Sequence, residues 1–376
     1  MGCNQDWKMA VILLLLLLLT GYTGWHLWML PPVAWMRWTL VGVEAACVAM
    51  AVFSLTRYLD RVPYGLAVAV YNAGNKGLVV IFYLFLFFLA ADLLRLLHVL
   101  PTAWIRDSWV STGVLSAAMA LLFVYASLHY EHKRRVELTI DTHGKVDHPV
   151  KVLAVSDLHL GYHNRRADLD RWVAMLNHEG GDMLLMAGDL IDRSMRPLLH
   201  EDMAEGLGGL QMPVYACLGN HEYYAAYYSP GEVEQFYSEA GITLLRDTVV
   251  NAGDVDIAGR DDRTNSRRKG IDEFVFRPAA FAVLLDHQPY HLEEAGQAGV
   301  DLQISGHTHR GQIWPLSWIT DALYECSWGE LRKGATTYYV SSGLGIWGAK
   351  YRIGTQSEYV VINLMPGTVE TTGAAQ

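Results

Sequence analysis

Charged side chains are scarce in this sequence of 376 residues. They make up 18% of it and hydrophobic residues 52%, which is poor in charge for a soluble enzyme and indicates that part of the chain lies in lipid. The shortage falls at one end, because residues 1–130 hold 7 of the 29 Lys and Arg residues and 5 of the 39 Asp and Glu residues. The remainder has the composition of an ordinary, acidic globular domain.

Basic stripes and cysteine pairs are missing as well. Binding along a nucleic-acid backbone depends on clustered Lys and Arg, so an acidic domain is a poor candidate and we expect no nucleic-acid partner. The four cysteines have no paired or CxxC spacing, which argues against a disulfide framework and against a zinc ribbon. They are Cys3, Cys47, Cys217 and Cys326.

Four apolar runs precede residue 131, at about 9–30, 35–55, 76–97 and 109–128. Each is close to the ~20 residues that a spanning helix needs. We therefore predict a transmembrane domain with four helices over residues 1–130, in a multi-pass integral membrane protein. A cleaved signal peptide is the alternative for the first run, but three runs would still hold the protein in the bilayer. Glu44 lies inside the second run, either as a functional group or in an interhelical hydrogen bond.

Basic residues set the expected orientation. With four spans, the N-terminus, the second loop and the C-terminal half share one side of the membrane, whereas an odd number would separate them. The shared side carries Lys8, Arg57, Arg61, Lys76, Lys133, Arg134 and Arg135, and the other side carries Arg37, Arg95 and Arg106. By the positive-inside bias, the C-terminal half is predicted to face the cytoplasm.

Short apolar runs that end in polar residues fill the second part of the chain. We predict a juxtamembrane linker over 131–149, a domain over 150–364 and a tail over 365–376. Five runs are expected to form buried strands: 150–156, 183–187, 214–218, 281–286 and 301–305. In layered α/β proteins, catalytic groups gather at the carboxyl ends of strands, so these five strands can aim side chains at one crevice.

The residues after these strands form five blocks. In order they are Asp157-Leu158-His159, Gly188-Asp189-Leu190-Ile191-Asp192, Gly219-Asn220-His221-Glu222, His287, and Gly306-His307-Thr308-His309. Each block alone could be a turn or an incidental histidine, but all five in this order resemble the calcineurin-like metallophosphoesterase superfamily. The extensions after Glu222 and Arg310 resemble its membrane-linked branch, which includes the group named transmembrane protein with metallophosphoesterase domain.

This resemblance implies a fold and a metal shell. The fold would be an α/β domain in which helices flank a β-sandwich, in four α/β/β/α layers, behind the four-helix transmembrane region. The shell would hold two divalent ions, with Mn²⁺ as a working choice and Fe, Zn or Co as alternatives that these ligands also accept. The first ion would bind Asp157, His159, Asp189 and His309, and the second Asp189, Asn220, His287 and His307.

The resemblance also implies a mechanism. A metal-bridging hydroxide would attack a phosphodiester or pyrophosphate bond, and His221 would act as the general acid or orient the phosphate. Asp192 is expected to orient a metal ligand. Arg310, Tyr223 and Arg352 are expected to lie behind the ligands or at the substrate. Tyr224, Tyr227 and Tyr228 could extend an aromatic lip from Tyr223, or pack on the core.

The membrane region points to a substrate class. A hydrolase tethered to the bilayer meets lipids at high local concentration, so we expect a membrane lipid or a lipid-linked nucleotide as the phosphate-containing substrate. The basic loop over residues 260–269 could grip an anionic headgroup or be a plain solvated loop. Two alternatives stay open: a phosphoesterase for soluble substrates that is merely tethered, and a transporter or sensor whose metal-binding domain is regulatory.

Overall fold

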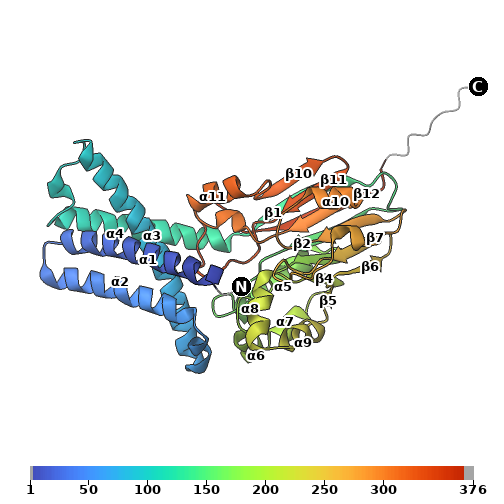
Figure 1. The fold of residues 1–376 in the computed structure, drawn as a ribbon, viewed down its shortest axis with the longest axis horizontal. Helices are drawn as coiled ribbons and strands as arrows, with labels where there is room; N and C mark the ends of the chain where they lie inside the picture. Colours follow the sequence, from blue (N-terminus) through green and yellow to red (C-terminus); the bar gives the residue numbers. More distant parts are fainter. Residues whose placement is uncertain (1–2, 368–376) are drawn as a thin grey trace, which may run out of the picture. The chain divides into compact units, whose positions relative to one another are not determined.

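The computed structural model describes residues 3–367, without the side chains of residues 3–10, 12 and 13. Most of the expected tail, residues 365–376, lies outside this described part. The chain divides into two compact units, Met1–Ser127 and Leu128–Gln376 (Figure 1).

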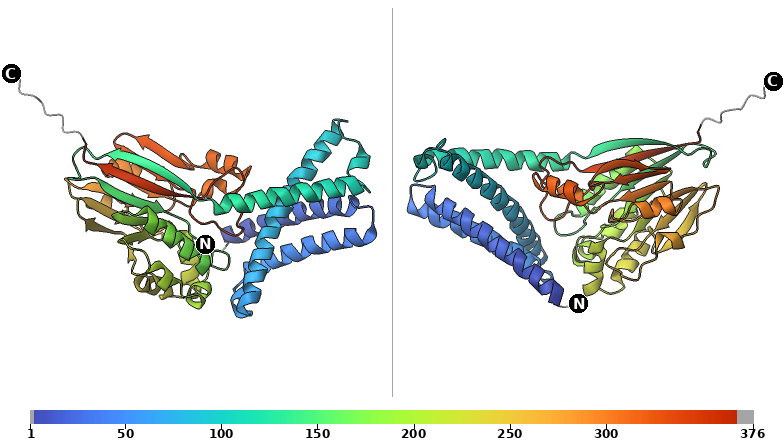
Figure 2. Two further views of the ribbon diagram at one scale, coloured as in Figure 1. Left: turned by 180° about the vertical axis from the view of Figure 1, so that it is seen from behind. Right: turned by 45° about the horizontal axis from the view of Figure 1, so that its top comes forward.

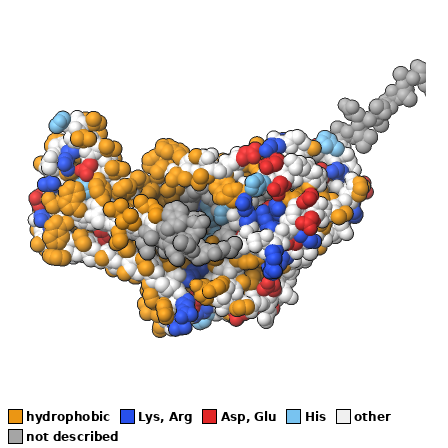
Figure 3. All heavy atoms as spheres, in the orientation of Figure 1, with side chains coloured by type: hydrophobic (Ala, Val, Ile, Leu, Met, Phe, Trp, Pro, Cys, Tyr) orange, Lys and Arg blue, Asp and Glu red, His pale blue; other side chains and the backbone are white. Residues whose placement is uncertain are grey.

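Four long helices make up the first unit. They are α1 (Cys3–Met29), α2 (Ala34–Ser54), α3 (Tyr64–Leu96) and α4 (Trp109–Glu131), with short 3-10 turns η1 (Arg57–Arg61) and η2 (Thr102–Trp104). Among the described residues, α2, α3 and α4 are long and apolar enough to cross a membrane, and α1 contributes a shorter apolar stretch, Leu14–Met29. Hydrophobic side chains dominate the visible surface of this unit (Figure 3).

Helix α3 differs most from expectation. It begins at Tyr64, whereas the apolar run predicted a start near residue 76. Lys76 therefore lies within the helix and not in the second loop, so it no longer counts among the loop charges that set the orientation. Arg57 and Arg61 do lie between helices, in η1.

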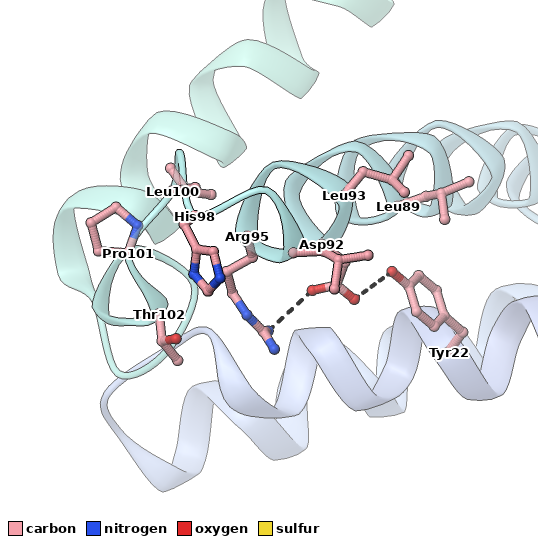
Figure 4. A pocket seen from close by; sticks show the side chains of 10 residues that line it. Tyr22, Leu89, Asp92, Leu93, Arg95, His98, Leu100, Pro101 and Thr102 are labelled. Atoms are coloured by element: carbon pink, nitrogen blue, oxygen red, sulfur yellow. Dashed lines mark hydrogen bonds and ion pairs between the residues drawn. The ribbon is translucent and has the colours of Figure 1, made fainter.

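Polar side chains within the first unit are paired with one another. Glu44 of α2 accepts a hydrogen bond from Thr23 of α1, and both are buried. Asp92 of α3 accepts from Tyr22 (2.8 Å) and Arg95 (3.1 Å), as Figure 4 shows. Such pairing is what apolar surroundings require of carboxylates. For Glu44, the structure thus provides the interhelical hydrogen bond.

The second unit contains two six-stranded mixed sheets (Figure 2). The first has the order β1 (Arg134–Asp141), β12 (Glu358–Met365), β2 (Val150–Val155), β3 (Met183–Ala187), β4 (Val214–Cys217), β5 (Thr243–Leu244). The second has the order β10 (Gly329–Lys333), β11 (Thr336–Val340), β9 (Leu302–Ser305), β8 (Phe281–Leu285), β7 (Val255–Gly259), β6 (Thr248–Ala252). Strands β2, β3 and β4 are parallel neighbours, as are β7, β8 and β9, so their carboxyl ends share an edge in each sheet.

The segment expected to be a linker, residues 131–149, contains a strand. β1 pairs with β12 in parallel along its whole length. Only Leu138 and Ile140 of this strand are buried, so its sequence shows little of the apolar character that marks the central strands. Two residues, His132 and Lys133, separate α4 from β1.

Alternating side chains on the strands divide the buried residues among separate clusters. On β8, Val283 and Leu285 join a cluster that includes residues of the first sheet, whereas Leu284 packs with Leu292 and other residues beside the second. A third cluster joins the first sheet to helices, including Trp172 of α5. The helices of this unit are α5 (Arg166–Glu179), α6 (Arg196–His200), α7 (Met203–Leu207), α8 (Asn220–Tyr228), α9 (Glu232–Glu239), α10 (Glu293–Gln297) and α11 (Leu316–Leu323), with 3-10 turns η3 (Ile271–Glu273) and η4 (His309–Gly311).

Candidate metal centre

Histidine and aspartate side chains from both sheets converge at the strand ends. Three overlapping groups have ligand atoms within 4.8 Å of one another: Asp157, His159 and His309; Asp189, His287 and His307; and His159, Asp189 and His221. The residues of the first group follow β2 and β9. Those of the second group follow β3, β8 and β9. The structure thus brings together six of the seven expected ligands, and Asn220 begins α8 directly after β4.

The first group surrounds a point between two imidazole rings. Nε2 of His159 lies 3.0 Å from Nε2 of His309. Oδ1 of Asp157 lies 3.5 Å from the His309 nitrogen and 3.8 Å from the His159 nitrogen. Two ring nitrogens and a carboxylate oxygen that face one another form a donor set typical of a transition-metal ion.

Asp189 lies between the first group and the second. Its Oδ2 is 3.1 Å from Nε2 of His287 and 3.7 Å from Nε2 of His159. Oδ1 of Asn220 is buried and has no hydrogen-bond partner among the described residues. Buried polar atoms nearly always have one. The Asn220 oxygen therefore fits a metal ligand better than it fits a purely structural cluster.

The backbone is strained where the ligands lie. Five residues of the expected shell have positive φ, between 45° and 71°: Asp157, His159, Asp189, His307 and His309. Such a conformation costs of order 1 kcal/mol or more for a non-glycine residue and is common at functional sites. Gly188 also has a positive φ of 80°, and a Cβ there would lie 2.7 Å from the ring of His287. A side chain at position 188 would thus displace a ligand.

The carboxylates of the site favour protonation of two of its histidines, His159 and His287. Burial works against a charged imidazole, but the nearby carboxylates of Asp157 and Asp192 outweigh it and raise the pKa of His159 to about 10. Burial likewise opposes charge on His287, and the charge of Asp189 raises its pKa well above the usual value. Divalent cations would supply the same compensation that these protons provide.

A family model and several sequence relatives match this domain. A family model described as calcineurin-like phosphoesterase matches residues 150–311. An uncharacterized metallophosphoesterase of Aquifex aeolicus is 30% identical over 259 residues, which cover 65% of this chain and 96% of the relative. The chain belongs to the calcineurin-like metallophosphoesterase family. This family binds two divalent metals, and the clusters above fit such a site.

One relative of this metallophosphoesterase is named as a transmembrane protein. The transmembrane protein with metallophosphoesterase domain of Danio rerio is 27% identical over 338 residues, 81% of this chain and 75% of the relative. That match is longer than the unit Leu128–Gln376, so it extends into the apolar helices. An uncharacterized metallophosphoesterase of Campylobacter jejuni is 28% identical over 260 residues, 65% of this chain and 67% of the relative. The chain spans 61% of the length of two Helicobacter pylori relatives.

His221 of the metallophosphoesterase domain lies at the edge of the site. Its Nδ1 is hydrogen-bonded to the backbone carbonyl of Asp192, which leaves Nε2 as the free ring nitrogen. Its ring packs edge-on against His159, with 4.5 Å between centroids. His221 was expected to lie outside the metal shell, but the third geometric group includes it. Tyr224 packs against the other side of His221, at 5.2 Å, and is half exposed.

Asp192 lies close to both His159 and His221. Its Oδ1 is 3.6 Å from Nδ1 of His159 and 3.6 Å from Nδ1 of His221. Burial opposes ionisation of this carboxyl, but the neighbouring imidazole of His159 lowers its pKa below the usual value. An ionised carboxylate in this position can fix the orientation of both rings.

Glu222 supports the site in a way that the sequence analysis missed. Its buried carboxylate accepts hydrogen bonds from the backbone N–H groups of Gly219 (2.7 Å), Ile191 (2.9 Å) and Asp189 (3.1 Å). It therefore ties the turn after β3 to the turn after β4, which carry Asp189 and Asn220. Burial, with the charge of Asp189, raises the pKa of Glu222 to about 7. The available signal was the acidic residue three positions after Gly219, which begins a helix as the capping box does.

Arg352 is a positioning residue in this structure. It is fully buried and donates to the carbonyl oxygens of His309 (2.7 Å) and Ser342 (2.5 Å). Of its two expected places, behind the ligands or at the substrate, it therefore occupies the first. It holds the backbone of the loop that carries His309.

Tyr223 and Arg310, which were expected behind the ligands or at the substrate, contact other residues. The hydroxyl of Tyr223 donates to Asp261 (2.7 Å) and accepts from Arg246 (2.9 Å). The guanidinium of Arg310 stacks 4.4 Å above the ring of Trp328. Tyr223 is thus fixed in a polar network outside the groups of ligands, and Arg310 is held against an aromatic ring.

The basic loop over residues 260–269 is built around a buried acid. Arg260 (3.2 Å) and Arg268 (3.0 Å) both donate to the carboxylate of Asp286, which directly precedes His287. Two of the five cationic side chains in this loop therefore bind a buried carboxylate and not a lipid headgroup. Arg263 is exposed and lies 4.1 Å over the ring of Tyr290.

Proposed function

We propose that this protein is a membrane-anchored, two-metal phosphoesterase that hydrolyses a phosphodiester or pyrophosphate bond. The observation that carries the proposal is the position of Asp189. One oxygen of its carboxylate, Oδ2, faces both His159 in one group of ligands and His287 in the other. A shared carboxylate between two sets of imidazoles is what a two-metal site requires.

The proposed ligands are those expected from the sequence. Asp157, His159, Asp189 and His309 would hold one ion, and Asp189, Asn220, His287 and His307 the other. When bound, such ions neutralise charge on the phosphoryl oxygens and provide an activated water at neutral pH. Mn²⁺ is our first choice for tests, with Fe, Zn and Co as alternatives.

The chain's own groups would handle the proton and the geometry. Because Nδ1 of His221 is bonded to the Asp192 carbonyl, Nε2 is the nitrogen left to face the leaving group. We assign His221 either proton transfer to that group or orientation of the phosphate. Asp192 would fix the orientation of the His221 and His159 rings. Glu222 and Arg352 would hold the loops on which the ligands lie.

We further propose that all four long helices cross the membrane, with the catalytic domain on the cytoplasmic side and in four α/β/β/α layers. The apolar surface of the helices supports four membrane crossings. Arg57 and Arg61 between α2 and α3 support the cytoplasmic side for the catalytic domain. The three buried clusters of the domain support the four-layer arrangement. A membrane lipid or lipid-linked nucleotide is the proposed substrate, by the effective concentration that tethering provides.

Hydrolysis of bis-p-nitrophenyl phosphate by the full chain in nanodiscs tests the enzyme proposal. We expect turnover that depends on added Mn²⁺ and stops on chelation. Asp189→Ala is expected to abolish it, and His221→Ala to lower kcat by about 10²–10⁴-fold while Mn²⁺ binding is retained. His291→Ala, at an exposed position outside the site, is the matched control. Metal binding without turnover in the native chain would favour a regulatory domain instead.

A panel of lipid phosphodiesters and pyrophosphates in the same nanodiscs addresses the substrate. A kcat/KM at least tenfold higher for a lipid than for its water-soluble headgroup analogue is expected. Equal values would favour a phosphoesterase for soluble substrates that is merely tethered.

A further inference from the structure

A group of large apolar side chains is exposed on the catalytic domain. We call it the tryptophan patch: Trp314 (42% exposed), Trp318 (64%), Ile319 (55%), Leu323 (70%) and Trp347 (46%). Trp314 and Trp318 pack edge to face, with 5.4 Å between ring centroids. In the space-filling view, hydrophobic side chains gather over α11 (Figure 3).

Helix α11 is inverted relative to an ordinary surface helix. A surface helix buries its apolar stripe and exposes its polar face. In α11, Ser317 is the buried residue, and the larger apolar residues Trp318, Ile319 and Leu323 face outward. The helix is therefore suited to present apolar side chains to something outside the domain.

The tryptophan patch borders the candidate metal centre. Helix α11 follows η4, the turn that carries His309, with which it packs. The side chain of Gln312 donates to the backbone carbonyl of Trp347 (3.0 Å), which joins the two segments of the patch. Whatever covers the patch thus lies near the turn that carries His309.

The chain itself indicates the bilayer as the occupant. Apolar helix α4 ends at Glu131 and β1 begins at Arg134, a connection that spans at most ~11 Å. The domain is therefore tied close to the membrane in which its helices lie. Tryptophan is the side chain that most favours the interface between headgroups and acyl chains, and the patch has three.

We propose that the tryptophan patch docks on the lipid bilayer and sets the metal centre against the headgroups, so that a lipid can enter from the membrane. The docking stands on the exposed residues, the short connection and the proposed membrane helices. Only the statement about substrate entry rests on the proposed phosphoesterase function. The experiments below therefore measure the two separately.

Lipid quenching tests the docking directly. The full chain is reconstituted in phosphatidylcholine and phosphatidylglycerol nanodiscs with an environment-sensitive fluorophore on Leu323→Cys, and labelling of the native chain is subtracted. Doxyl-labelled phospholipids are expected to quench this fluorophore at least twofold more than one on Val275→Cys, an exposed apolar control outside the patch (85% exposed). Equal quenching at both positions would overturn the proposal. So would protection of Leu323→Cys that depends on protein concentration, because it would indicate a second copy of the chain.

Substrate entry is tested with the double variant Trp318→Glu/Leu323→Glu. Both residues are exposed, so the domain is expected to fold and to hydrolyse bis-p-nitrophenyl phosphate as the native chain does. Hydrolysis of a lipid phosphodiester in nanodiscs is expected to fall about tenfold, because charges at the interface oppose docking. An equal loss on both substrates would contradict a membrane role. If neither chain hydrolyses the soluble ester, the enzyme proposal fails while the quenching result still decides the docking.

Discussion

Replacement of Glu222 by Gln should weaken both the fold and the metal site. Both carboxylate oxygens of Glu222 accept hydrogen bonds. One accepts from the backbone N–H groups of Gly219 and Asp189, and the other accepts from the N–H of Ile191 and the hydroxyl of Tyr237. An amide offers one acceptor oxygen and one NH₂ group, which can only donate. In either orientation, Glu222→Gln therefore sets a donor against a buried backbone N–H.

The magnitude follows from the better of the two orientations. If the NH₂ group faces Ile191, one backbone N–H is unsatisfied, since the Tyr237 hydroxyl can turn to accept. One buried unsatisfied group costs about 1–3 kcal/mol. Loss of support behind metal ligands typically lowers affinity 10–100-fold, so a comparable drop for Mn²⁺ is expected.

Calorimetric titration with Mn²⁺ and thermal unfolding of the detergent-solubilised chain measure the two effects. Tyr237→Phe is the matched control, because it removes only the weakest contact to Glu222 (3.3 Å) and should cost about 0.5–1.5 kcal/mol. Native Mn²⁺ affinity in Glu222→Gln would refute the idea that this carboxylate holds the ligand turns in place.

Three further predictions address other parts of the domain. Mn²⁺ binding should release protons and tighten as pH rises from 6 to 8, because His159, with its pKa raised to about 10, must lose its proton to bind; titration heats that do not depend on the buffer would contradict this. Glu179→Gln should cost about 1 kcal/mol at neutral pH, because the hydrogen bond from Arg135 lowers the pKa of Glu179 to about 2. That stabilisation is complete above the unfolded value near 4.3 and is lost as pH falls toward 2, so urea unfolding curves of the two chains should converge there. Arg352→Met should cost about 2–6 kcal/mol of unfolding free energy, because the carbonyls of His309 and Ser342 lose their donor; an unchanged Tm would exclude the positioning role.

The strands that aim ligands were predictable because they are buried on both faces. A run such as Met183–Ala187 is apolar throughout, and its end at Gly188 and Asp189 is visible in the sequence. β1 was missed for the opposite reason. It is exposed along most of its length, and its alternation rests on two residues, Leu138 and Ile140.

The supporting residues of the site were harder to foresee than the ligand blocks. Whether Arg352 meets a substrate or a backbone carbonyl depends on where the segments around Ser342 and His309 lie in space. Tyr223 and Tyr224 are neighbours in sequence, yet one helix turns Tyr223 to Asp261 and Tyr224 to His221. Helical geometry separates adjacent side chains by about 100°, and the sequence alone does not fix which of them faces the site.

Anomalous diffraction from the Mn²⁺-loaded protein tests the central claim most directly. We predict two anomalous peaks ~3.5–4 Å apart. One should lie among Asp157, His159 and His309, the other between His287 and His307, with the Asp189 carboxylate shared by both. A single peak, or peaks away from Asp189, would contradict the two-metal account.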